Sequence, residues 1–392
     1  MKQVQIRLSR DSLLPDPLRV ARAASAPHLG PRILFFSGGS ALNGIARKLK
    51  TYTHNSVHLI TPFDSGGSSK VLREVFDMPA VGDLRSRLMA LADESVLGQP
   101  QVYALFSHRL PRDGSPAELR TQVERMARGK HPLISAISKP MRPLIQTQLD
   151  SFLAHATADF DYRYASIGNL ILAGGYLSQG RALEPVLFMM SKMVDVRGTV
   201  RAIVDETLHL GADLAGGGRV IGQRQISGKE APPLAQPITR LFLTDGSTET
   251  RVSLPKRNRK AIAEADVLCY PPGSLYSSVI ANLLPEGTGS SIAARHVPKV
   301  YLPSLGHDPE AIGHDLADQV GALLAPLLAD AGPEAQPRDM LTHVLCDPSM
   351  DAQACAAVTA RFGIDCLRLP LAQDAQPRYD TDSVARVLVS LA

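Results

Sequence analysis

Short apolar runs alternate with segments of helical spacing in both the first and the last third of the chain. The runs at 33–36 and 57–61 each lead into a turn rich in glycine and serine, and a helical pattern follows each turn. This alternation predicts an α/β fold in which helices cover both faces of a mostly parallel sheet. The same order returns after residue 261, with expected strands at 267–270, 300–302, 342–346 and 365–369 and expected helices at 275–284, 316–328, 352–362 and 383–391.

The middle of the chain has a different pattern. Apolar positions recur at helical spacing from residue 84 to 160 and no strand can be placed there, so we expect a helical insertion at about 94–160. Two more helices are expected near 169–177 and 183–194. Residues 198–245 then alternate like strands, which predicts a small β-rich excursion whose hairpin turn is Gly216-Gly217-Gly218. The expected strands of this excursion are 200–215, 219–226 and 238–243.

The composition is that of a globular chain with a large core. Of 392 residues, 44% are hydrophobic and 20% are charged, whereas a disordered chain would be poorer in apolar residues. Length alone would allow two or three domains, but one α/β unit with insertions fits as well. We therefore expect a single domain at 31–392, preceded by residues 1–30 as an arm or an extra strand.

The charge balance gives no support for nucleic acid binding. The formal net charge is only +4, and the densest basic run, at 256–260, has no interleaved aromatic residues for base stacking. No apolar stretch is long enough to span a bilayer, and the N-terminus lacks the apolar segment of a signal peptide. We expect a cytoplasmic protein that binds neither nucleic acid nor membrane.

The four cysteines predict reduced thiols rather than a disulfide framework. They include no C-x-x-C pair, and Cys269 and Cys346 lie inside apolar runs of strand length. Cysteine in such runs usually acts as a small apolar residue.

Three loops carry the candidate chemistry, because ligands of such sheets bind at the carboxyl ends of the strands. Loops 37–44, 62–69 and 271–278 follow expected strands, contain small residues and lead directly into helices. Backbone N–H groups at a helix N-terminus form an anion site, and glycine lets the backbone approach a ligand closely. We expect phosphate or diphosphate binding here, against the alternative that the small residues only form turns and helix caps.

Two well-known nucleotide-binding patterns are not matched. A Walker A loop would need Lys and Ser or Thr after Gly44, where Ile45 and Ala46 stand, and the glycines at 38–44 do not have the spacing G-x-G-x-x-G. Asp64 ends the second apolar run, where an acid could hold ribose hydroxyls. A nicotinamide-dependent dehydrogenase therefore stays as a third choice.

Asp64 and Asp83 are the acids of interest. Asp64 lies in a loop rich in glycine and serine, where it could hold Mg²⁺ against a diphosphate or orient an accepting hydroxyl. Asp83 follows Gly82 and could equally be the N-cap of the helix that begins near residue 84.

The chain carries five motifs in this order: FFSGGS at 35–40, DSGGSS at 64–69, GDLR at 82–85, SIGNL at 166–170 and PGSLYSS at 272–278. Together these motifs resemble those of CofD-like proteins. The resemblance runs from about residue 32 to the C-terminus, where PRYD at 377–380 is similar to the ending of the YvcK-like branch. The family contains the phospholactate transferase of deazaflavin coenzyme synthesis and the YvcK-like regulators that bind nucleotide sugars.

The resemblance implies a Rossmann-like three-layer domain whose loops hold the diphosphate of a nucleotide. In the transferase branch, a guanosine diphosphate-activated phospholactate is delivered to a deazaflavin hydroxyl with the help of Mg²⁺. In the YvcK-like branch, of which D-x-G-G-S-S is the hallmark, the ligand is a uridine diphosphate sugar.

This chain departs from the family pattern at several positions. The family has Thr-Gly where Ser40-Ala41 stand, and the insertion at 94–160 is longer than usual. These departures imply a changed ligand or a loss of the ancestral chemistry. The YvcK-like branch also has Asp, Asn, His and Gly where this chain has Ser65, Ser86, Ala165 and Pro271.

We therefore expect a transferase-like enzyme that acts on a nucleotide-diphosphate-linked substrate. The alternative is a non-catalytic regulator that binds a nucleotide sugar in the same pocket. Asp64 is the expected catalytic residue and Mg²⁺ ligand. The expected nucleotide- and phosphate-binding residues are Gly38, Gly39, Ser40, Asn43, Gly67, Ser68, Ser69, Asp83, Ser166, Asn169, Gly273, Ser274, Ser277 and Arg378.

The insertion at 94–160 is expected to form a dimer surface, with a lid over the site as the alternative. It carries more apolar positions than one helix needs for docking, and helices with a spare apolar stripe commonly bury it against a partner chain. Two-fold pairing is the commonest arrangement, so we expect a homodimer. These apolar positions are Leu119, Val123, Met126, Leu144, Ile145, Leu149 and Phe152.

Overall fold

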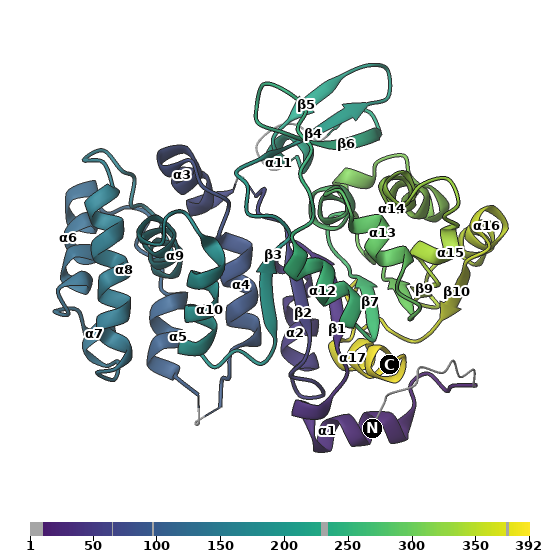
Figure 1. The fold of residues 1–392 in the computed structure, drawn as a ribbon, viewed down its shortest axis with the longest axis horizontal. Coiled ribbons are helices and arrows are strands. Elements are labelled where there is room, and N and C mark those ends of the chain that lie inside the picture. Colours follow the sequence, from purple (N-terminus) through teal and green to yellow (C-terminus); the bar gives the residue numbers. More distant parts are fainter. Residues whose placement is uncertain (1–10, 65, 96–97, 229–233, 374–375) are drawn as a thin grey trace.

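A seven-stranded parallel sheet forms the centre of the computed structural model, which describes residues 11–64, 66–95, 98–228, 234–373 and 376–392 (Figure 1). The strand order is β10-β9-β8-β7-β1-β2-β3, and every neighbouring pair is parallel. The predicted α/β fold with a mostly parallel sheet is thus confirmed. The strands are β1 (Ile33–Ser37), β2 (Val57–Ile60), β3 (Thr199–Ala202), β7 (Val267–Tyr270), β8 (Lys299–Tyr301), β9 (His343–Cys346) and β10 (Asp365–Arg368).

Helices connect these strands and surround the sheet. Most lie where the apolar spacing predicts them, and the segment expected at 275–284 forms two short helical turns, Leu275–Val279 and Ile280–Leu283. Within the described ranges, no helix combines the length and apolar character that crossing a bilayer requires. The helices are α1 (Pro17–Ser25), α2 (Asn43–Leu49), α3 (Gly67–Phe76), α4 (Gly82–Leu91), α5 (Pro100–Ser107), α6 (Pro116–Ala127), α7 (Pro132–Ser135), α8 (Met141–His155), α9 (Ile167–Ser178), α10 (Leu183–Met193), α11 (Gln223–Ile226), α12 (Lys256–Glu264), α13 (Thr288–Ala293), α14 (Leu316–Ala331), α15 (Pro337–Met340), α16 (Ala352–Phe362) and α17 (Thr381–Ser390).

Successive side chains of β1 point to opposite faces of the sheet and so belong to two separate layers of the core. Ile33 and Phe35 pack with α1, α2 and α17 on one face, whereas Leu34 and Phe36 pack with α12, α14 and α16 on the other. All five residues of β1 are buried, as expected for a strand covered by helices on both sides. The central strands therefore read as continuous apolar runs, which is why the sequence pattern locates them.

A small antiparallel sheet lies beyond the edge of the main layers (Figure 1). It consists of β5 (Arg219–Ile221), β4 (His209–Leu214) and β6 (Ile238–Thr244), in that order. The predicted hairpin turn is confirmed, because β4 pairs with β5 and the intervening Gly216 and Gly217 have φ angles of +85° and +91°. Such positive φ angles favour glycine over any residue with a Cβ atom.

Two details of the secondary structure differ from the prediction. β3 pairs in parallel with β2, so the small sheet begins after it and not at residue 198. The strand expected at 219–226 ends at Ile221 and is followed by α11. The described part of the N-terminal segment contains the helix α1, while residues 1–10 of the predicted arm or extra strand lie outside the described residues.

The helical insertion buries its apolar positions inside its own chain. Leu119, Val123, Met126, Ile145, Leu149 and Phe152 are all fully buried in a core shared by α3 to α10 and the edge of the main sheet. Leu144 alone of the seven named positions is exposed, at 48%. The prediction that these apolar positions form a dimer surface is therefore wrong. They cover α9 and its neighbours within the same chain and are not available to a partner.

Because of this packing, truncating Leu149 should destabilise the fold strongly, and by the same amount at any protein concentration. Leu149→Ala should lower the free energy of unfolding by about 2–5 kcal/mol, the usual effect of a buried Leu-to-Ala change. Leu144→Ala on the same helix is the matched control and should change it by less than about 0.5 kcal/mol. Urea unfolding at two protein concentrations measures both, and an effect of Leu149→Ala that shrinks with dilution would place Leu149 in an interface between chains.

Candidate functional site

A crevice opens where the strand order of the main sheet reverses. From β1 the chain proceeds to β2 and β3 on one side, and later to β7, β8, β9 and β10 on the other. The loops that follow β1 and β7 therefore diverge at the carboxyl edge, which is where open α/β sheets bind ligands. We call the space between them the switch-point crevice. It comprises an outer cavity of about 640 Å³ and an inner hollow of about 130 Å³, which share Ser40, Ala41, Pro272 and Gly273 in their linings.

The two loops contact each other closely at the base of the crevice. A Cβ atom at Gly38 would lie 2.7 Å from Oγ and 3.0 Å from Cα of Ser278, so only glycine fits at position 38. The side-chain amide of Asn282 donates to the carbonyl oxygens of Ser37 (3.0 Å) and Ser278 (2.7 Å). The end of β1 is thus fixed directly to the helical turns after β7.

A buried arginine lies beneath the loop that follows β1. Arg87 of α4 is fully buried, and its guanidinium donates to the carbonyl oxygens of Gly38 (3.4 Å) and Gly39 (3.1 Å). It also donates to Nδ1 of His58 (3.1 Å). Burial holds the pKa of His58 well below its usual range. Burial lowers the pKa of Arg87 to about 10, so the side chain stays positively charged at neutral pH. The loop therefore has a fixed positive charge directly behind it.

Asn43 completes the support of this loop. Its Oδ1 accepts a hydrogen bond from Nε of Arg87 (3.1 Å), and its Nδ2 donates to Oγ of Ser86 (2.9 Å). Both ends of the side-chain amide are thus engaged by α4. The structure places Asn43 as a support of Arg87, whereas the sequence predicts it as a ligand contact.

The helical turn after β7 is capped by two carboxylates. The amide of Leu275 donates to Asp308 (2.7 Å), and the amides of Tyr276 (3.1 Å) and Ser277 (2.7 Å) donate to Glu310. The hydroxyl of Ser277 also donates to Glu310 (2.5 Å). Glu310 has no exposed surface, and its burial raises its pKa to about 7.

This cap changes the interpretation of the third loop. The amides that were expected to bind phosphate already have carboxylate partners, and Ser277 is buried with its hydroxyl on Glu310. A ligand could reach Ser277 only by displacing Glu310. Gly273 and Ser274, in contrast, line the inner hollow together with Gly38, Gly39 and Ser40.

The second loop and the start of α4 lie beside the first loop. The carboxylate oxygens of Asp83 are 3.7 Å from the position of a Cβ atom at Gly39, so this acid faces the loop that follows β1. One oxygen of Asp64 accepts from the amide of Gly66 (3.1 Å), and the other lies 3.8 Å from the position of a Cβ atom at Gly82. Both acids thus lie beside Gly82, at the start of α4.

The other predicted residues of the second loop have mainly structural surroundings. Oγ of Ser69 accepts a hydrogen bond from the amide of Gly82 (3.0 Å) and is buried, which ties α3 to the start of α4. Gly67 begins α3 with a φ angle of +52°. Ser65 and the side chain of Ser68 lie outside the part of the chain that the structure describes.

Ser166 and Asn169 are buried at the start of α9 and are absent from the linings of the switch-point crevice. Oδ1 of Asn169 accepts from Nε of Arg85 (2.9 Å), and burial lowers the pKa of Arg85 to about 10. Arg85 belongs to the same helix as Asp83. These residues therefore connect α9 to the helix that carries Asp83 and Arg87.

The crevice is also lined by the loops that follow β8 and β10, which are not among the three loops predicted from the sequence. Ser304 follows β8 and exchanges hydrogen bonds with the backbone of Gly273, at 3.3 Å and 3.0 Å. His307 and the predicted Arg378 are exposed and line the outer cavity. The expected strands at 300–302 and 365–369 end at the same sheet edge, so their following loops could have been included on the same argument.

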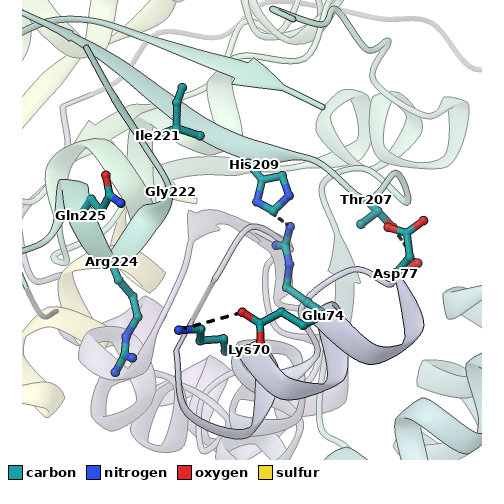
Figure 2. Close-up of a pocket in the computed structure, with 10 residues that line it drawn as sticks. Lys70, Glu74, Asp77, Thr207, His209, Ile221, Gly222, Arg224 and Gln225 are labelled. Carbon is teal, nitrogen blue, oxygen red and sulfur yellow. Dashed lines mark hydrogen bonds and ion pairs between the residues drawn. The ribbon is translucent and has the colours of Figure 1, made fainter. Parts of the chain in front are cut away.

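A second pocket, of about 280 Å³, lies between α3 and the small sheet (Figure 2). Lys70 and Glu74 pair along α3, and Arg73 donates to Nδ1 of His209 on β4 (3.3 Å). The guanidinium of Arg73 also donates to the backbone of Pro62 and Leu208. These contacts join the small sheet to α3. The pocket borders the second loop, because Nε of Arg224 lies 3.6 Å from the position of a Cβ atom at Gly66.

The chain is similar to proteins of known family. A family model described as 2-phospho-L-lactate transferase CofD matches residues 33–365. The gluconeogenesis factor of Bacillus subtilis is 30% identical over 294 residues, which are 75% of this chain and 74% of that protein. The gluconeogenesis factor of Halalkalibacterium halodurans is 28% identical over 293 residues, or 74% of this chain and 72% of that protein. A relative from Nostoc sp. is 30% identical over 295 residues, but the match spans only about half (52%) of its length.

A solved structure supports the same assignment of the fold. The crystal structure of a UPF0052 family protein from Bacillus halodurans has a TM-score of 0.66 at 23% identity, covering 92% of this chain and 98% of that one. With the family model matched over most of the chain, from β1 to the start of β10, this chain belongs to the CofD family.

Proposed function

We propose that the switch-point crevice binds the diphosphate of a nucleotide-linked ligand. The observation that carries this proposal is the buried, charged Arg87 behind the loop that follows β1. A fixed positive charge under glycine-rich backbone attracts an anion, and the effect is large where water is excluded. Gly38, Gly39 and Ser40 would lie against the phosphates from one side and Gly273 from the other.

The outer cavity supports a ligand larger than a diphosphate alone. Its volume of about 640 Å³ is within the range of pockets that hold small organic ligands and cofactors. Arg378 offers a planar set of donors suited to phosphate or carboxylate oxygens, and His307 adds a further polar group at the rim. We infer that the nucleoside or the linked group occupies this outer cavity.

Asp64 and Asp83 fit the requirements of a Mg²⁺ site only together with the ligand. Mg²⁺ is typically held by one or two carboxylates plus phosphate oxygens. The two acids flank the turn around Gly82, and Asp83 faces the loop proposed to hold the phosphates. When bound, the ion would neutralise phosphate charge and orient the diphosphate.

Two functions remain compatible with this site. The family description supports transferase chemistry, in which Asp64 binds the ion or orients an accepting hydroxyl. The relatives are named gluconeogenesis factors and not transferases, which supports the alternative of a non-catalytic regulator. That such a regulator binds a nucleotide sugar is implied by the resemblance of the motifs to the YvcK-like branch. Both functions need the diphosphate site, so binding is the first property to test.

Replacing Arg378 should weaken ligand binding without affecting the fold. Arg378 is exposed and lines the outer cavity, so Arg378→Ala removes donors to a charged group at little cost in stability. We expect about tenfold to a hundredfold weaker binding of the tightest ligand among GDP, UDP and UDP-glucose, measured by calorimetry. Arg361→Ala on α16 removes the same charge at a distant exposed position and should leave the affinity unchanged. Equal affinities of both variants would show that the ligand places no charged group beside Arg378 in the outer cavity.

Replacing Asp64 should distinguish its functional role from a structural one. Asp64→Asn keeps the shape of the side chain but removes the charge that would hold Mg²⁺, so the gain in ligand affinity on adding Mg²⁺ should be lost. Asp365→Asn at the far edge of the sheet is the control. Thermal melting accompanies both titrations, and a collapse of the melting temperature of Asp64→Asn alone would mark Asp64 as structural. Release of free nucleotide by the wild type and not by Asp64→Asn would favour the transferase over the binding protein.

A further inference from the structure

Three of the four cysteines in the chain meet in one place. Cys346 is the last residue of β9, Cys366 lies on β10, and Cys355 belongs to α16. Their three sulfur atoms all lie within 4.8 Å of one another. The fourth, Cys269, is buried in β7 in the core on the other face of the sheet. We call the three the thiol cluster.

The fold brings the three sulfurs together from separate elements. β9 and β10 are parallel, with Cys366 opposite Val344 and Arg368 opposite Cys346. Cys346 and Cys366 are thus offset by two residues and lie on the same face of the sheet. α16 covers this face and directs Cys355 and Val358 into the core, at the outer edge of the molecule near β10 (Figure 1).

The thiol cluster is largely buried yet open to solvent on one side. Cys346 has no exposed surface and Cys355 is 7% exposed, whereas Cys366 is partly exposed on β10, the edge strand of the sheet. Sγ of Cys366 lies 3.6 Å from the carbonyl oxygen of Cys355 and donates to it. An ion could therefore enter past Cys366 and reach a site enclosed by the other two thiols.

We propose that the thiol cluster binds one soft metal ion of the Cu(I) class in three-coordinate geometry. Thiolates select soft ions, and structural zinc sites almost always have four protein ligands. Among the described residues, the group that brings these sulfurs together includes no histidine or carboxylate that could serve as a fourth ligand. Binding forms three metal–sulfur bonds and releases the protons of the thiols that become thiolates, with no change in oxidation state. The inference is independent of the proposed nucleotide site.

The test uses the reduced full-length protein and Cu(I) as the probe, under anaerobic conditions. Titration against a chromophoric Cu(I) chelator should show uptake of one ion per chain. Cys366→Ser should weaken binding by at least about tenfold, since even loss of an indirect partner of a metal ligand has an effect of that size. Cys269→Ser is the matched control and should retain the wild-type stoichiometry and affinity.

A measurement on the wild type makes the test independent of any variant that fails to fold. Iodoacetamide should modify Cys366 first in the metal-free protein, because it is the most accessible thiol of the cluster, and Cu(I) should protect it. Peptide mass spectrometry identifies the modified residue. No uptake by the reduced protein, equal affinity of Cys366→Ser and the wild type, or unchanged modification of Cys366 would each overturn the proposal. So would a Cys346–Cys366 disulfide in the isolated protein whose reduction yields no Cu(I) binding.

Discussion

The contacts of one buried guanidinium determine the shape of the candidate site. Arg87 holds the backbone of Gly38 and Gly39 from below, and Asn43 and His58 complete its set of acceptors. A buried cation is costly unless its donors are satisfied, so the loop, α2, β2 and α4 are constrained to one arrangement. In the proposed site, the same charge that fixes the loop would attract an anion in front of it. The support of the loop and the proposed binding would thus depend on the same side chain.

A second set of buried contacts holds the opposite wall of the crevice. Glu310 and Asp308 cap the helical turn after β7, and Asn282 links that turn to the end of β1. Because these carboxylates occupy the first amides of the turn, the positive end of that helix is already compensated. An anion bound as we propose would therefore be attracted mainly from the side of β1, where the charge of Arg87 is fixed. The loops after β1 and β7 are both rich in glycine and serine, but the first lies over a buried arginine and the second is capped by carboxylates.

Features that depend on neighbouring residues could be predicted from the sequence, whereas features that depend on contacts between distant parts of the chain could not. The central strands and the loops after β1 and β7 were predictable, because buried strands and glycine-rich turns are encoded by neighbouring residues. The membership of β3 in the main sheet was not, because a short run at 199–202 has the same pattern in either sheet. Arg87 and Glu310 could not be found from their neighbours, since each acts on a loop more than thirty residues away. The thiol cluster could not be predicted for the same reason, because its three cysteines come from separate elements and each one by itself resembles an apolar core residue.

The central claim is that the switch-point crevice holds a nucleotide-linked diphosphate, and native mass spectrometry of the purified protein tests it most directly. The protein is purified without added nucleotide, and it is also incubated with millimolar GDP, UDP and UDP-glucose. We expect a mass increment on the folded chain that is lost on denaturation, and fragmentation of the released compound should yield a diphosphate. A folded protein that carries no phosphate-containing compound after purification, and takes up none of these nucleotides at millimolar concentration, would contradict the account.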